Sequence, residues 1–224
     1  MEYPNLSILV VTYNRKNTLR NSLLAIKQHL SYNGNKRIFV ADDGSNDGTQ
    51  EMLASEFPEA TIVQSLRGGL GANTNAGIHS AFLFSDYILQ FQDDMRLLVN
   101  LDLHPHVELL MNNPVCGMVR LWGVGGHKYQ AELEGNYWRV WWSSPELYIP
   151  SDRPHVKHKR FHDAFGFYPE GLSTSETEQA WCHQCKDISG VLPKPLDVYV
   201  PQNALTETTW EHCEWGNRWR DKGL

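Results

Sequence analysis

Short apolar runs alternate with amphipathic stretches along the first hundred residues. The run at 6–11, LSILVV, predicts a strand that is buried on both faces. Leucines and isoleucines then recur at helical spacing and predict an amphipathic helix over 16–31. The alternation continues, with strands expected at 37–41, 61–63 and 87–91, a helix capped by Ser45 or Asn46 that runs through Leu53, and a helix over 71–84. This spacing predicts parallel strands joined by right-handed crossovers.

Polar clusters follow three of these strands directly. They are Thr12-Tyr13-Asn14-Arg15, Asp42-Asp43-Gly44-Ser45 and Gln92-Asp93-Asp94. Ligands bind an open parallel sheet outside the carboxyl ends of its strands, so we expect these side chains to converge. Crowded carboxylates repel one another unless a cation joins them, and oxygen ligands suit Mg²⁺ or Mn²⁺. A turn with a helix cap explains the second cluster alone, but not three clusters in order.

The second half has a different composition from the first. All eight tryptophans lie after residue 120, and no Gly/Pro-rich linker separates the halves. We therefore expect an irregular, aromatic-lined half that shares one sheet system with the first.

Composition and charge narrow the function classes. The chain has 224 residues, with 41% hydrophobic and 21% charged, which is typical of a globular protein. Its formal net charge of −6 gives no basic footprint for nucleic acid. There is no apolar stretch long enough to span a membrane and no signal-peptide pattern, so we expect a soluble, cytoplasmic protein.

Four stretches also match a known family in order and spacing across residues 6–98. They are ILVVTYNR at 8–15, VADDGS at 40–45, NTNAG at 73–77 and LQFQDD at 89–94. Together they resemble the nucleotide-sugar-dependent glycosyltransferases of family 2. The resemblance implies the GT-A fold, an α/β fold with a Rossmann-like, mainly parallel central sheet and helices on both faces. It also implies that residues 1–100 bind the donor, and that 101–224 bind the acceptor and supply the catalytic base within the same domain.

The resemblance further implies roles for individual residues. Thr12, Tyr13 and Asp43 are expected at the nucleobase and ribose, with Asp43 accepting a base N–H. The full set of expected donor-binding residues is Thr12, Tyr13, Asn14, Asp42, Asp43, Arg67, Asn75, Gly77 and Asp93. Asp94 matches the last aspartate of the family's D-x-D metal motif, although Gln92 replaces the first aspartate. His212 is the expected late histidine ligand of Mn²⁺ or Mg²⁺.

The catalytic base of inverting members lies at a helix start, in a motif similar to E-D-x-E. Aligning Ser175-Glu176-Thr177-Glu178 with that motif makes Glu176 the expected base and Glu178 the second acidic residue. The alternative is that both glutamates only stabilise the positive end of the helix dipole. The Q-x-x-R-W signature of processive synthases is absent from the sequence after this helix, which favours a single-addition enzyme.

Three further motifs have open interpretations. Cys182 and Cys185 are ordinary buried thiols, or they form a zinc site with Cys213 and either His212 or His183. The histidine-rich stretch 155–162 is a solvated basic loop, or a mobile segment that faces an acceptor or a phosphate. The aromatic stretch 137–142 is an acceptor platform, or it packs between the two halves.

The sequence thus favours a metal-dependent, inverting, non-processive glycosyltransferase with a nucleoside-diphosphate-sugar donor, most consistent with UDP. The alternatives are an inactive nucleotide- or glycan-binding protein of the same fold, or a sugar nucleotidyltransferase. The latter usually carries glycines after the first strand, where this chain has TYNRKN at 12–17. The acceptor class is open among glycans, lipid-linked glycans, proteins and small molecules, and the sequence neither supports nor excludes a nucleic-acid acceptor.

Overall fold

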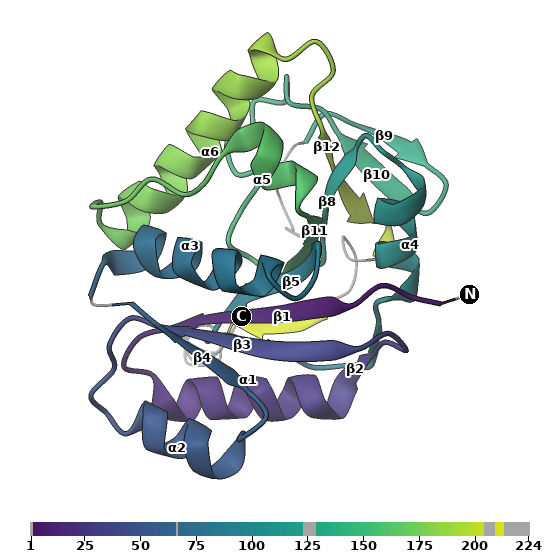
Figure 1. Ribbon diagram of the computed structural model, residues 1–224. Coiled ribbons are helices and arrows are strands. Elements are labelled where there is room, and N and C mark those ends of the chain that lie inside the picture. Colours follow the sequence, from purple (N-terminus) through teal and green to yellow (C-terminus); the bar gives the residue numbers. More distant parts are fainter. Residues whose placement is uncertain (1, 66, 123–128, 204–208, 213–224) are drawn as a thin grey trace, which may run out of the picture.

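A computed structural model describes residues 2–65, 67–122, 129–203 and 209–212 (Figure 1). In chain order, the elements are β1 (Leu6–Thr12), α1 (Lys16–His29), β2 (Leu30–Ser31), β3 (Lys36–Asp42), α2 (Thr49–Glu56), β4 (Thr61–Gln64), α3 (Gly69–Phe82), β5 (Tyr87–Gln92), β6 (Met95–Leu97), β7 (Leu101–Asp102), α4 (His104–Asn112), β8 (Cys116–Arg120), β9 (Ala131–Glu134), β10 (Tyr137–Val140), β11 (His155–His158), α5 (Arg160–Phe165), α6 (Thr174–Val191), β12 (Asp197–Pro201) and β13 (Trp210–His212). The predicted strands and helices of the first half are confirmed to within a few residues at their ends.

One sheet runs through both halves of the chain. Its nine strands lie in the order β4-β3-β1-β5-β11-β8-β12-β10-β9. The first four pair in parallel, as predicted, and β8 with β12 is also parallel. Strands β11 and β10 run against the others. The expectation that the two halves share a sheet is therefore confirmed.

Helices cover both faces of this sheet (Figure 1). Alternate residues of β1 point to opposite faces: Ile8 and Val10 join the cluster formed with α1, α2 and α4, while Leu9 and Val11 join the cluster formed with α3, α5 and α6. Both clusters are buried, and the burial of each aliphatic side chain stabilises the fold by about 1.5–3 kcal/mol. A continuous apolar run in β1 is what two buried faces require.

Helix α3 lies unusually close to the sheet at Gly77. A Cβ atom there would be 2.6 Å from Leu9 Cδ1 and 2.9 Å from Ala41 Cβ, so a side chain at this position would collide with β1 and β3. Glycine therefore sets the height of α3 above the sheet.

A two-stranded ribbon brings the end of the described chain back to its middle. Strand β13 pairs antiparallel with β6, which sets His212 opposite Met95. Trp210 is fully buried, with its ring centroid 5.1 Å from that of Phe91 on β5. The ribbon is thus anchored to the core beside the end of β5.

Two local predictions are wrong. Helix α2 starts at Thr49 after Gly48, whose φ of 86° is left-handed, and neither Ser45 nor Asn46 caps it. Asp47 Oδ1 accepts from the Thr49 N–H instead, at 3.1 Å.

The histidine-rich stretch is neither a solvated nor a mobile loop. It forms β11 and α5, and His155, Lys157 and His162 are buried. Three of its buried side chains have partners inside the fold: His155 Nδ1 bonds the Arg153 carbonyl, His162 Nδ1 bonds the Gly166 carbonyl and Lys157 Nζ donates to Gln90 Oε1, each at 2.7 Å. A strand of this composition does not show the apolar pattern by which the other strands were predicted.

Within the part of the chain that the structure describes, no helix is long and apolar enough to cross a membrane.

Candidate active site

The polar clusters of the first half meet at one edge of the sheet. Strands β3, β1 and β5 are parallel neighbours, so their carboxyl ends lie side by side. Strand β11 is antiparallel to β5, with His155 opposite Gln90, and its start therefore lies at the same edge. The candidate site is built from three strand ends and one strand start.

A pocket of about 380 Å³ opens at this edge. Its lining comprises Val11, Thr12, Tyr13, Arg15, Asp43, Gly69, Leu70, Asn73, Gln92, Asp93 and Thr174. Tyr13 is 44% exposed, which leaves it accessible to a ligand. Of the residues predicted to bind the donor, Thr12, Tyr13, Asp43 and Asp93 are brought together here.

The Asp43 carboxylate organises the pocket wall at the start of α3. Its Oδ1 accepts from Ser65 Oγ at 2.6 Å and from the Gly68 N–H at 2.9 Å, and its Oδ2 accepts from the Gly69 N–H at 3.0 Å. A negative charge is stabilised at this end of a helix. Arg67 lies in the same loop with a left-handed φ of 53° and is exposed.

Asp42 and Asn14 shape the loops behind the pocket. Asp42 is fully buried and accepts from the Ser45 N–H at 3.1 Å. Asn14 has a left-handed φ of 51°, its N–H donates to Ser45 Oγ, and its Oδ1 accepts from the Asn46 N–H, both at 2.8 Å. These contacts tie the end of β1 to the end of β3.

The structure does not bring Asn75 and Gly77 into the pocket. Asn75 Nδ2 donates to the Tyr168 carbonyl at 2.9 Å and to Glu170, while Gly77 packs on the sheet. Asn73 lines the pocket instead, and its Nδ2 donates to Ala41 O at 3.0 Å and to Thr12 O. Its place one helical turn before Gly77, near the start of α3, is the signal that could have identified it.

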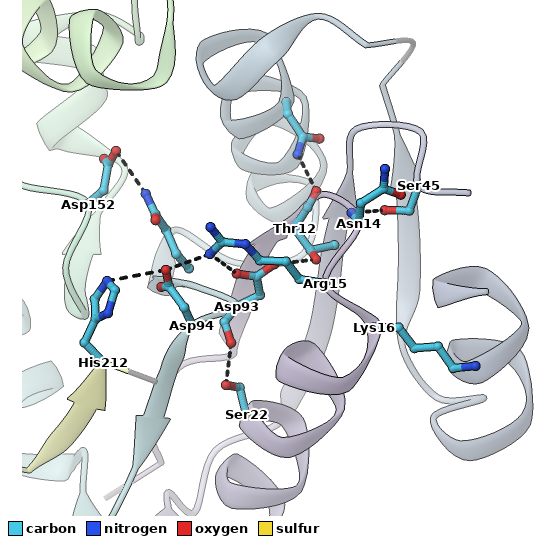
Figure 2. A network of polar contacts seen from close by, with 12 residues as sticks. Thr12, Asn14, Arg15, Lys16, Ser22, Ser45, Asp93, Asp94, Asp152 and His212 are labelled. Atoms are coloured by element: carbon cyan, nitrogen blue, oxygen red, sulfur yellow. Dashed lines mark hydrogen bonds and ion pairs between the residues drawn. The ribbon is translucent and has the colours of Figure 1, made fainter. Parts of the chain in front are cut away.

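Asp93 and Asp94 carry the strongest charge interactions of the site (Figure 2). Arg15 Nη1 lies 3.3 Å from Asp93 Oδ1 and 2.8 Å from Asp94 Oδ2, so one guanidinium bridges both carboxylates. Thr12 Oγ1 donates to Asp93 Oδ2 at 2.7 Å. Burial raises the pKa of Asp93 to about 7, and the bonds from Thr12 and the charge of Arg15 oppose that rise.

The residues predicted to bind a metal lie together. His212 Nε2 is 3.4 Å from Asp94 Oδ2 (Figure 2). The other oxygen, Asp94 Oδ1, is buried and has no hydrogen-bond partner among the described residues. Nowhere in the described ranges do three His, Cys, Asp or Glu side chains gather as metal ligands, so the protein offers this carboxylate and imidazole as a partial set.

The two candidate bases differ in their surroundings. Glu176 is exposed and forms a capping box with Ser173 at the start of α6, where hydrogen bonds from Ser173 lower the pKa of Glu176. Glu178 is half-buried and faces the segment before β11. Burial, followed by the negative charge of Asp152, raises the pKa of Glu178 to about 7. Glu176 thus caps the start of α6, whereas Glu178 takes no part in the capping box.

Asp152 is a buried acid at this edge that the sequence analysis missed. Its Oδ2 lies 3.5 Å from Gln92 Nε2, on the strand that ends at the site. The signal was weak, because Asp152 precedes a strand whose apolar pattern is itself missing.

The cysteine motif lies elsewhere. Cys182 and Cys185 are free and buried in α6, and Cys182 Sγ donates to the Pro150 carbonyl at 2.8 Å. His183 is exposed on another face of the helix, His212 faces Asp94, and Cys213 lies outside the described residues. In the aromatic stretch, Trp142 is buried and packs against Phe165.

A larger cavity of about 780 Å³ lies at the far end of the β6–β13 ribbon, between Leu101, His106 and Thr209. Burial lowers the pKa of His106 to about 4, so this imidazole is neutral. The carboxylates described above belong to the smaller pocket and its surroundings, which we therefore treat as the candidate site.

Comparison with known proteins gives one family match. The model of glycosyl transferase family 2 matches residues 7–169, more than half of the chain. No curated protein sequence matches.

Several solved structures share the fold. S. aureus TarS 1–349 in complex with UDP-GlcNAc has a TM-score of 0.64 at 17% identity, over 96% of this chain and 61% of that one. The mannosyltransferase PcManGT from Pyrobaculum calidifontis, in complex with GDP-Man and Mn²⁺, has a TM-score of 0.58 at 15% identity, over 90% and 58%. GalNAc-T7 with UDP, GalNAc and Mn²⁺ has a TM-score of 0.64 at 12% identity, over 89% and 43%. This chain therefore spans less than two thirds of each of these relatives.

Proposed function

The chain belongs to glycosyl transferase family 2, and on that premise we propose that it moves a sugar from a nucleoside diphosphate to an acceptor hydroxyl. The observation that carries this proposal is the convergence of Tyr13, Asp43 and Asp93 on one pocket at the carboxyl edge of the sheet. UDP is the proposed nucleotide, since the tyrosine-plus-aspartate pocket resembles uridine-binding members and two fold relatives were solved with UDP or UDP-GlcNAc.

The nucleotide is proposed to lie between Tyr13 and the start of α3. The exposed Tyr13 ring would stack on the base, while Asp43 holds the loop of Gly68 and Gly69 in place. Arg15 stands at the diphosphate end, where a guanidinium binds phosphate oxygens well.

The residues present fit a divalent cation. A buried Asp94 oxygen without a hydrogen-bond partner and the nearby His212 nitrogen are ligand types that Mn²⁺ accepts. When bound, such an ion would neutralise charge on the departing diphosphate. With few protein ligands, such an ion would keep open positions for phosphate oxygens.

Glu178 is our proposed general base, in preference to Glu176. A base works best with a pKa near the working pH, and burial places Glu178 there, while the capping box engages Glu176. Glu178 takes the proton of the acceptor hydroxyl as the acceptor oxygen bonds to the anomeric carbon. The bond from that carbon to the diphosphate breaks with its electron pair on the diphosphate, which inverts the carbon.

A thermal-shift panel tests the proposal. Wild type, Asp94→Ala and the surface control Asp187→Ala are heated with UDP, GDP, CDP or dTDP, each with and without Mn²⁺. A nucleotide at a concentration 100 times its dissociation constant raises the free energy of unfolding of the protein by about 2.7 kcal/mol. We expect UDP to stabilise wild type and the control only with Mn²⁺, and Asp94→Ala not at all. If no nucleotide shifts wild type, the proposed function is wrong.

A further inference from the structure

The mechanism above leaves the Asp152 carboxylate unused, although it lies at the same edge of the sheet. The antiparallel register sets His155 against Gln90, so the chain just before β11 passes Gln92 and Asp93. Both of those residues line the pocket. Asp152 therefore stands beside the pocket wall on the β11 side of the sheet, whereas Asp43 follows β3 on the other side of β1 and β5. Figure 2 shows Asp152 near Asp94 and His212.

The two oxygens of Asp152 are poorly satisfied. Oδ2 is 3.5 Å from Gln92 Nε2, which is the long limit for a hydrogen bond. Oδ1 is buried and has no hydrogen-bond partner among the described residues, and the side chain is only 5% exposed. A buried acceptor without a partner costs free energy, and a donor group from a ligand would recover it.

A buried polar network holds Asp152 in place from behind. Lys157 is fully buried on β11, and its Nζ donates to Gln90 Oε1 at 2.7 Å. Gln90 Nε2 donates to the Tyr168 hydroxyl at 3.3 Å, and that hydroxyl faces Asp152. Burial raises the pKa of Asp152, and Tyr168 and then the charge of Lys157 oppose that rise. Asp152 is thus the member of this network that lies next to the pocket residue Gln92.

The surroundings favour a neutral donor group over a cation. In the described ranges, no metal-type cluster of three acidic, histidine or cysteine side chains includes Asp152. Besides the Tyr168 hydroxyl, the Gln92 amide faces Asp152, and it is an N–H donor whose long contact is easily exchanged for a better one. Gln92 lines the pocket and lies between the pocket and Asp152. A ligand in the pocket that displaces the Gln92 amide can therefore take its place as the hydrogen-bond donor to Asp152.

We propose that Asp152 accepts a hydrogen bond from a hydroxyl of the donor sugar and so discriminates among sugars carried on one nucleotide. This inference rests on the proposed function. With the base near Tyr13 and the diphosphate near Arg15, the sugar lies beyond Gln92, beside the neighbouring carboxylates of Asp152 and Glu178.

Calorimetric titration with and without the sugar tests the assignment. Wild type, Asp152→Asn and the exposed control Asp187→Asn are titrated with UDP and UDP-GlcNAc, and with GDP and GDP-mannose, in Mn²⁺. For the pair that binds wild type, we expect Asp152→Asn to weaken the nucleotide sugar by about tenfold or more, since a bond to a charged group is lost. The affinity for the nucleoside diphosphate alone stays within about twofold, and the control changes neither.

A second variant guards against misfolding. Asp152→Asn leaves Lys157 buried without its counter-charge, whereas Asp152→Asn with Lys157→Met removes both charges together. The double variant is expected to show the same selective loss.

The outcomes separate the two proposals. If both variants bind the sugar nucleotide as wild type does, or lose both ligands equally, Asp152 does not contact the donor sugar. If Asp152→Asn keeps its affinity for the nucleotide sugar but loses turnover, then the hydroxyl that Asp152 binds belongs to the acceptor, and the inference is wrong. If wild type binds none of the four ligands, the proposed function fails and this inference fails with it.

Discussion

The sequence predicts the position of a site residue well when that residue lies at the end of a strand. It does not predict residues whose position depends on the pairing of distant strands or on the face of a helix. Thr12 directly follows an apolar run, and Asp43 and Asp93 come one residue later after theirs, so their positions follow from those runs alone. Asp152 enters the site only because β11 is antiparallel to β5, and no local pattern shows this. Glu176 and Glu178 are two residues apart on one helix, and only the turn of α6 decides which one faces Asp152.

The pH dependence of turnover separates these two glutamates. A base must be deprotonated, and the pKa of Glu178 is raised to about 7 by burial and by Asp152. The ratio kcat/KM should therefore rise with pH through about 7, as Glu178 loses its proton. Glu178→Gln should lower the rate by about 10²–10⁴-fold and abolish this limb. Glu176→Gln, the matched control, should keep both the rate and the limb. The reverse result in initial-rate profiles would make Glu176 the base.

At the level of elements, a glycine sets the distance between α3 and the sheet. The sequence analysis had expected this residue, Gly77, to bind the donor. Gly77 touches Leu9 and Ala41 rather than the pocket. The first four strands and their helices were predictable because their apolar periods are regular. Strand β11 was not, because one of its two central residues is a buried lysine, Lys157, whose partner, Gln90, is distant in sequence.

Adding one methyl group to α3 should lower stability. Gly77→Ala places a Cβ within 3 Å of two buried side chains, so we expect a loss of about 1–3 kcal/mol in the free energy of unfolding by urea denaturation. Gly190→Ala is the control, since a Cβ there meets nothing within 4 Å in α6. It should leave stability unchanged or slightly higher. Equal effects of the two substitutions would contradict the packing role of Gly77.

For the whole molecule, the expected donor half and acceptor half are not separable layers. Strand β5 of the first half pairs with β11 of the second, and Phe91 packs against Trp210. The site likewise combines Asp94 with His212. Composition predicted the contrast between the halves, but the order of strands in the sheet depends on pairings distant in sequence.

Residues 1–100 expressed alone should therefore not fold cooperatively. The fragment would expose the edge of β5 and the apolar face that α4 covers. Circular dichroism should show a broad, shallow melt, while the full chain should unfold in one sharp transition. A sharp melt of the fragment would instead make the first half an independent domain.

The reversed direction of β11 has a consequence for how such a site can change. The wall near Tyr13 and Asp43 is made by strand ends, while the wall near Asp152 is made by the chain that enters β11. Insertions or exchanges between β10 and β11 can therefore remodel one wall without altering the other. Variation during evolution, or grafting in the laboratory, could accordingly replace the sugar that is read while leaving recognition of its nucleotide carrier intact.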